Sequence, residues 1–170
     1  MKKILAGLAS LIGVAACGQD APYGSNVNFS ARESTNSYFF TATSRGPLFV
    51  DVRGAYPGFV AEEVTDNILR AMERGMQTRP FKATNRMEDA HSPDYRVYWL
   101  ISPPKNFNAN RLCKGEIPDS VPQDKPTFMI VFCVGDEVYR NMSGWVQKDV
   151  DAGSETFSKF VGVVTRDLFK

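Results

Sequence analysis

The sequence predicts an α+β protein in which two amphipathic helices pack on one face of a mixed or antiparallel sheet of about four to five strands. Two apolar runs, residues 95–101 and 127–134, are typical of strands buried on both faces. Two other segments, near residues 60–75 and 154–168, repeat apolar residues at helical spacing. A length of 170 residues with 43% apolar and 23% charged residues fits one globular domain.

The net charge excludes one class of partner. The chain carries 20 Lys and Arg residues against 19 Asp and Glu residues, so it has no basic excess to neutralise phosphates. We therefore expect no nucleic acid among its partners.

The first sixteen residues have the pattern of a secretory signal. Met1-Lys2-Lys3 gives a cationic start, and an apolar run of thirteen residues follows from Ile4 to Ala16. Because a membrane-spanning helix needs about twenty apolar residues, this run is too short for a permanent anchor. We expect residues 1–16 to be removed as a signal peptide.

The end of that run, Val14-Ala15-Ala16-Cys17, resembles the lipobox of bacterial lipoproteins. The resemblance implies lipidation of Cys17 by diacylglycerol, cleavage just before it, and acylation of the new amino group by a chain such as palmitate. Three acyl chains anchor a protein stably, whereas one binds only marginally. Gly18 stands where enteric bacteria place an Asp for inner-membrane retention, so the resemblance implies the outer membrane and a domain facing the periplasm. A plain signal peptide, or a core helix of a cytosolic protein, remains the alternative.

Residues 17–37 are rich in Gly, Ser, Asn and charged side chains and show no sustained apolar period. This composition predicts a flexible tether with a reach of roughly 25 Å. A single globular domain is then expected over residues 38–170.

The elements of that domain follow from periodicity and turn residues. Residues 48–52 predict a strand and residues 54–58 a turn. A helix is predicted from Val60 to about Gly75, followed by a short strand at 81–84 and a helical turn at 86–90. The apolar positions of the predicted helix that begins at Val60 are Val60, Val64, Ile68, Ala71, Met72 and Met76.

The second half predicts a central strand over 95–101, a hairpin and a closing helix. Gly135-Asp136-Glu137 separates the strand 127–134 from a further strand ending at 146, which indicates a hairpin with a three-residue loop. Ser154 is expected to cap the last helix. The apolar positions of that helix are Phe157, Phe160, Val161, Val164 and Leu168.

Residues 48–101 resemble small α/β domains of the bacterial envelope. The order strand, helix, short strand and helical turn leads into Asp94-Tyr95-Arg96-Val97. This pattern is similar to the amino-terminal domain of the Tol translocation protein and to envelope-assembly lipoproteins. The resemblance implies binding to other proteins and supplies no catalytic residues.

Few residues suggest chemistry. His91 lies among carboxylates in residues 88–94, and residues 149–155 partly match a calcium loop, but a solvated loop and a helix-capping turn explain these segments better. The sequence contains no P-loop, no dinucleotide fingerprint and no nucleophile elbow. We expect no enzyme activity, no catalytic residue, no cofactor and no metal. A set of strand aromatics could form a ligand-stacking surface, although core packing is favoured: Tyr95, Tyr98, Trp99 and Trp145.

The long segment from Ser102 to Pro126 is expected to be the functional surface. It has twenty-five residues, five of them proline, and no clear periodicity. Loops of this length in compact domains commonly bind partners, although a passive crossover is the alternative. Phe107, Arg111 and Leu112 are the candidate contacts.

Cys113 and Cys133 are the two cysteines left once Cys17 is acylated, and we expect them to form a disulfide. An exported domain with an even pair of cysteines commonly forms a bridge in the oxidising periplasm. A buried free thiol or a metal pair is the alternative, but two thiolates without a nearby His make a poor zinc site.

Two functions are compatible with these observations. The favoured one is a non-catalytic lipoprotein, anchored in the membrane, that scaffolds or assists an envelope complex by binding another envelope protein. The alternative is a carrier of a lipid or other apolar ligand, which would need an apolar cavity between helices and sheet.

Overall fold

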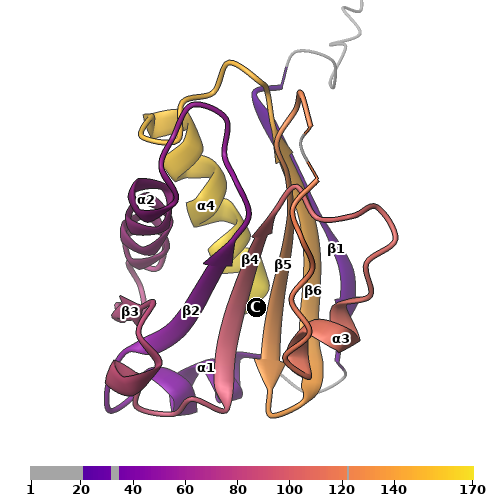
Figure 1. Ribbon diagram of the computed structural model, residues 1–170. Helices are drawn as coiled ribbons and strands as arrows, with labels where there is room; N and C mark the ends of the chain where they lie inside the picture. The colour runs from indigo at the N-terminus through magenta and orange to yellow at the C-terminus, as the bar shows by residue number, and fades with distance from the viewer. Residues whose placement is uncertain (1–20, 32–34, 122) are drawn as a thin grey trace, which may run out of the picture.

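The computed structural model describes residues 21–31, 35–121 and 123–170. In this part of the chain one six-stranded sheet has the order β1-β6-β5-β4-β2-β3, with helices on both faces (Figure 1). The strands are β1 (Tyr23–Ser30), β2 (Leu48–Arg53), β3 (Ala83–Thr84), β4 (Tyr95–Ile101), β5 (Thr127–Val134) and β6 (Glu137–Val146). The helices are α1 (Thr35–Thr43), α2 (Ala61–Gly75), the 3₁₀ turn η1 (Met87–Asp89), α3 (Ala109–Cys113) and α4 (Glu155–Leu168).

The predicted α+β class with a mixed sheet is confirmed. Strand β2 is parallel to β3 and β4, whereas β4, β5, β6 and β1 pair antiparallel. Six strands are present among the described residues rather than four to five. The β5–β6 turn has two residues, Gly135 and Asp136, instead of three, and Gly135 takes a positive φ of 57°.

The prediction that residues 17–37 form a flexible tether is wrong for the part that the structure describes. Residues 23–30 form β1, which pairs with β6 from Tyr23 opposite Val146 to Ser30 opposite Arg140. Residues 35–37 belong to α1. Strand β1 is polar because it is an edge strand with much of its surface in solvent, so backbone pairing holds it in place without a long apolar face.

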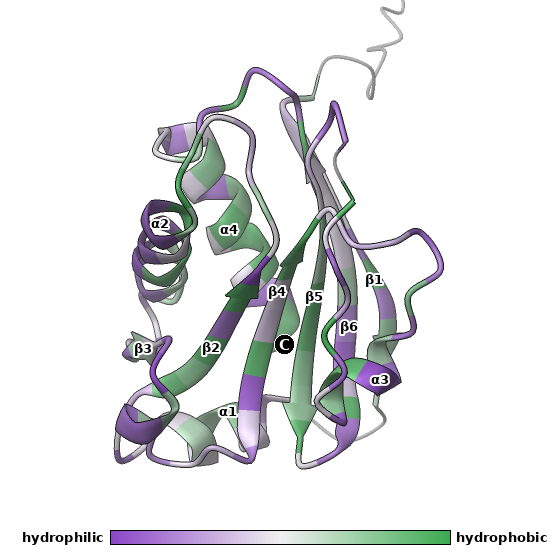
Figure 2. Ribbon diagram, viewed as in Figure 1, coloured by the Kyte–Doolittle hydropathy of each residue, from purple (hydrophilic) through white to green (hydrophobic). Residues whose placement is uncertain are grey.

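Helices α2 and α4 cover one face of the sheet and form the main core with it. The core is filled by aromatic rings, among them Trp99 of β4, Phe128 of β5 and Phe160 of α4, whose centroids lie 5.1 to 6.2 Å apart. Figure 2 shows β5 as hydrophobic along most of its length. A residue larger than Gly at position 75 would collide with Gly162, because a Cβ there would lie 2.6 Å from the Gly162 Cα. The two helices therefore cross at close range.

Helix α3 packs on the opposite face of the sheet (Figure 1). The expectation that the two amphipathic helices share one face is thus met by α2 and α4, while the segment expected to be a loop supplies a short helix for the other face. No helix within the described residues is long and apolar enough to cross a membrane.

Candidate partner-binding groove

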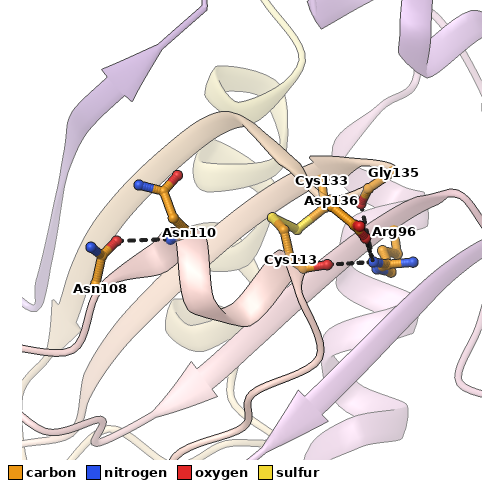
Figure 3. The surroundings of a disulfide bond; sticks show 7 residues. All are labelled: Arg96, Asn108, Asn110, Cys113, Cys133, Gly135 and Asp136. Carbon is orange, nitrogen blue, oxygen red and sulfur yellow. Dashed lines mark hydrogen bonds and ion pairs between the residues drawn. A yellow bond between two sulfur atoms is a disulfide. The ribbon is translucent and has the colours of Figure 1, made fainter.

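The disulfide expected between Cys113 and Cys133 is present. It joins the last residue of α3 to β5, with 5.5 Å between the two Cα atoms. Arg96 of β4 strengthens this junction, because its Nη2 donates to the Cys113 carbonyl at 2.5 Å and to the Gly135 carbonyl at 3.0 Å (Figure 3). At the other end of α3, Asn108 Oδ1 accepts a hydrogen bond from the Asn110 backbone N–H at 2.9 Å. A five-residue helix too short to be stable alone is therefore fixed at both ends.

A second, smaller core lies beneath α3. Leu112 is completely buried, and it belongs to a cluster with Tyr98, Leu100, Val131 and Val138 on this face of the sheet. The prediction that Leu112 is a surface contact is therefore wrong. Because that segment has no periodicity in the sequence, its buried and exposed apolar residues could not be told apart.

The other two predicted contacts remain at the surface. Arg111 is exposed, forms an ion pair with Glu116 at 2.6 Å, and holds its guanidinium carbon 5.7 Å from the centre of the Phe107 ring. Phe107 is half-buried and packs against the smaller core. Phe107 and Arg111 thus form an aromatic and cationic pair at the surface of this segment.

A β-bulge in β1 brings Phe29 to the same face as α3. Val27 pairs with Met142, which is buried in the main core, but the register shifts at the next residue and Phe29 pairs with Asn141. Asn141 in turn lies opposite Val131 of the smaller core. Directly paired residues share a face of a sheet, so the bulge turns Phe29 away from the main core and toward α3. Its side chain is 49% exposed.

These elements enclose a surface hollow of about 900 Å³, which we call the α3 groove. Aromatic rings, carboxamides and charges of both signs line it. Asn141 contributes a buried Oδ1 that accepts no hydrogen bond from the described chain. The lining residues are Phe29, Phe107, Asn108, Ala109, Asn110, Lys114, Asp136, Glu137, Val138 and Asn141.

The other residues that the sequence singled out do not form a common site among the described residues. His91 is exposed, and among the described residues no group of three or more His, Cys, Asp or Glu side chains is placed to hold a metal ion. Ser154 caps α4 by accepting from the Phe157 N–H at 3.1 Å, so residues 149–155 form a helix-capping turn. The aromatic set divides between the two cores and the surface: Trp99 and Tyr98 are buried, and Tyr95 and Trp145 are half-buried.

The lipobox and Cys17 lie outside the described residues. Sequence reasoning missed Phe29, Val138 and Asn141 as groove residues. The alternation of polar and apolar residues over 26–29 was the available sign of a strand, but a bulge that re-aims one side chain leaves no such sign.

No known family model matches the chain, and no curated protein matches it either. Among solved structures, the chain is similar to a PelC dodecamer from Paraburkholderia phytofirmans. The two share 8% identity and a TM-score of 0.36, over 86% of this chain and 93% of that one. A likeness this distant carries no argument about function.

Proposed function

We propose that this protein is a non-catalytic lipoprotein, anchored through Cys17 in the outer membrane, that assists an envelope complex by holding a polypeptide segment of another envelope protein in the α3 groove. The observation that carries the proposal is the assembly of this groove from three separate parts of the chain. The bulge of β1 supplies Phe29, the disulfide-bonded segment supplies Phe107, and the start of β6 supplies Asn141.

The chemistry of the groove suits a peptide. Carboxamides both donate and accept hydrogen bonds, as a peptide backbone does, and Asn108, Asn110 and Asn141 line the hollow. The unpartnered Oδ1 of Asn141 is an acceptor that a backbone N–H can satisfy. Phe29 and Phe107 offer apolar area for one side chain of the partner, and aromatic residues commonly carry much of the binding energy at such surfaces.

The alternative function, carriage of a lipid or another apolar ligand, has no comparable support. Such a ligand would occupy the space between the sheet and the helices α2 and α4. That space is packed with the rings of Trp99, Phe128, Phe157 and Phe160, each 0–2% exposed.

Photo-crosslinking in the native bacterium tests the proposal. The photoreactive residue p-benzoylphenylalanine is placed at Phe29 in one variant and at Val27 in a second. The two sites are a matched pair, because both side chains are 49% exposed on the same strand and lie on opposite sides of the bulge. A third variant combines the probe at Phe29 with Asn141→Ala.

We expect a discrete crosslinked adduct from the Phe29 position that is absent from the Val27 position and reduced several-fold by Asn141→Ala. The same partner should appear by mass spectrometry when the probe is moved to Phe107. Equal adducts at Phe29 and Val27, or an adduct indifferent to Asn141→Ala, would show that the groove does not hold the partner.

A further inference from the structure

The first described residue, Ala21, is four positions after Cys17 in the sequence. The Ala21 carbonyl accepts from Gln147 Nε2 at 3.2 Å, and the Pro22 carbonyl accepts from the Gln147 backbone N–H at 2.9 Å. The neighbouring Val146 N–H donates to the Pro126 carbonyl at 3.2 Å. Residues 21–22, 124–126 and 145–149 thus meet at one end of the sheet, which we call the anchor edge. Figure 1 shows β1 beginning at this end, where β6 finishes.

Only Gly18, Gln19 and Asp20 separate Cys17 from Ala21. Whatever path these residues take, four Cα–Cα steps span at most about 14 Å. A tether ending at residue 37 would instead have reached roughly 25 Å. Because β1 takes up most of the expected tether, a lipid on Cys17 cannot hold the domain far from the bilayer.

The anchor edge has the composition of a surface that contacts lipid headgroups without strong electrostatic attraction. Trp145 is half-buried, and the Lys125 ammonium lies 3.2 Å from the centre of its ring. Tryptophan and lysine both place an apolar body next to a polar tip, which suits the boundary between lipid and water. Lys125 and Lys148 are balanced by Asp124 and Asp149, so the acyl chains rather than charge must supply the attachment.

We propose that the anchor edge rests against the lipid headgroups in the acylated protein, with Trp145 and Lys125 in contact with them. This inference rests on the lipidation of Cys17 in the proposed function. Strand β6 then runs away from the bilayer, and its ten residues separate the anchor edge from the Gly135-Asp136 turn by roughly 30 Å. The α3 groove, which includes Asp136 and Glu137, is held toward the periplasm and receives a protein segment rather than a lipid.

Site-specific quenching tests this orientation. Lys148→Cys and Asp136→Cys place one thiol at each end of β6, and both positions are exposed. Each new thiol is the one available for labelling, because Cys17 is acylated and Cys113 is bonded to Cys133. The acylated proteins carry a fluorescent label and are reconstituted into phosphatidylethanolamine–phosphatidylglycerol vesicles that contain a lipid with a headgroup-proximal nitroxide quencher.

We expect the label at Lys148→Cys to be quenched several-fold more than the label at Asp136→Cys. Insertion of a spacer of about ten Gly and Ser residues after Gly18 adds a reach of roughly 18 Å and should remove most of that difference. Equal quenching at both positions, or a difference that survives the spacer unchanged, would overturn the proposed orientation. The intact mass of the same samples reports acylation of Cys17, so a failure of lipidation is distinguished from a failure of orientation.

Discussion

Removal of the Cys113–Cys133 bridge should destabilise the domain by about 3 kcal/mol. The bridge has a sequence separation of 20, so it closes a loop of 21 residues counting both ends. For a loop of this size the chain-entropy relation gives an entropy of about −11 cal/mol/K, which corresponds to about 3 kcal/mol at 25 °C. The bond also fixes α3 over the smaller core, which a five-residue helix could not do by itself.

The assay is urea unfolding at neutral pH of the natural protein and of the double variant Cys113→Ala, Cys133→Ala. We expect the variant to unfold at lower urea with a free energy of unfolding lower by about 3 kcal/mol. Addition of a reductant should bring the natural protein to the same midpoint and leave the variant unchanged. A difference in the free energy of unfolding under about 1 kcal/mol would refute this reasoning about the loop. A natural protein whose urea midpoint does not change when reductant is present during unfolding would refute it as well.

Three further predictions concern packing and protonation. Leu112→Ala should lower the free energy of unfolding by about 2–5 kcal/mol, because the side chain is fully buried, whereas the exposed Arg111→Ala should lower it by less than about 1 kcal/mol in the same urea titration. Burial raises the pKa of the Tyr56 hydroxyl to about 12 from an ordinary 10.0, so its contribution to stability is complete below pH 10 and is lost as the pH rises toward 12; Tyr56→Phe should show a flatter loss of stability over that range. Gly75→Ala should destabilise by about 1–3 kcal/mol in thermal unfolding, since its Cβ would meet the Gly162 backbone, and an unchanged melting temperature would contradict the close helix crossing.

The elements with strong periodicity were predictable from sequence. Strands β4 and β5 occupy the predicted residues because all the residues of these strands except Arg96 are apolar or β-favouring, a pattern typical of strands buried on both faces. Helices α2 and α4 were predictable from apolar residues at helical spacing and, for α4, from the capping Ser154. In each of these four elements, most of the residues that the local apolar pattern predicts to be buried pack in one of the two cores.

The polar edge of the fold was not predictable in this way. Strand β1 contains Gly, Ser and Asn, which favour turns and linkers, and only its pairing with β6 makes it a strand. Helix α3 is too short to show a period, so Leu112 could not be recognised as buried. The groove depends on the β1 bulge at Val27 and Phe29, which is a property of the pairing and has no local signature.

The proposed lipid anchor on Cys17 connects the proposed binding role of the α3 groove, the short link to the domain and the proposed orientation on the membrane. The most direct measurement is the intact mass of the protein extracted with detergent from the membranes of its native bacterium. We expect a chain that begins at Cys17 and carries the mass of a diacylglyceryl group and a third acyl chain, and we expect Cys17→Ser to abolish that mass. A mature protein that begins at another residue, or a soluble protein without acyl mass, would contradict the proposal.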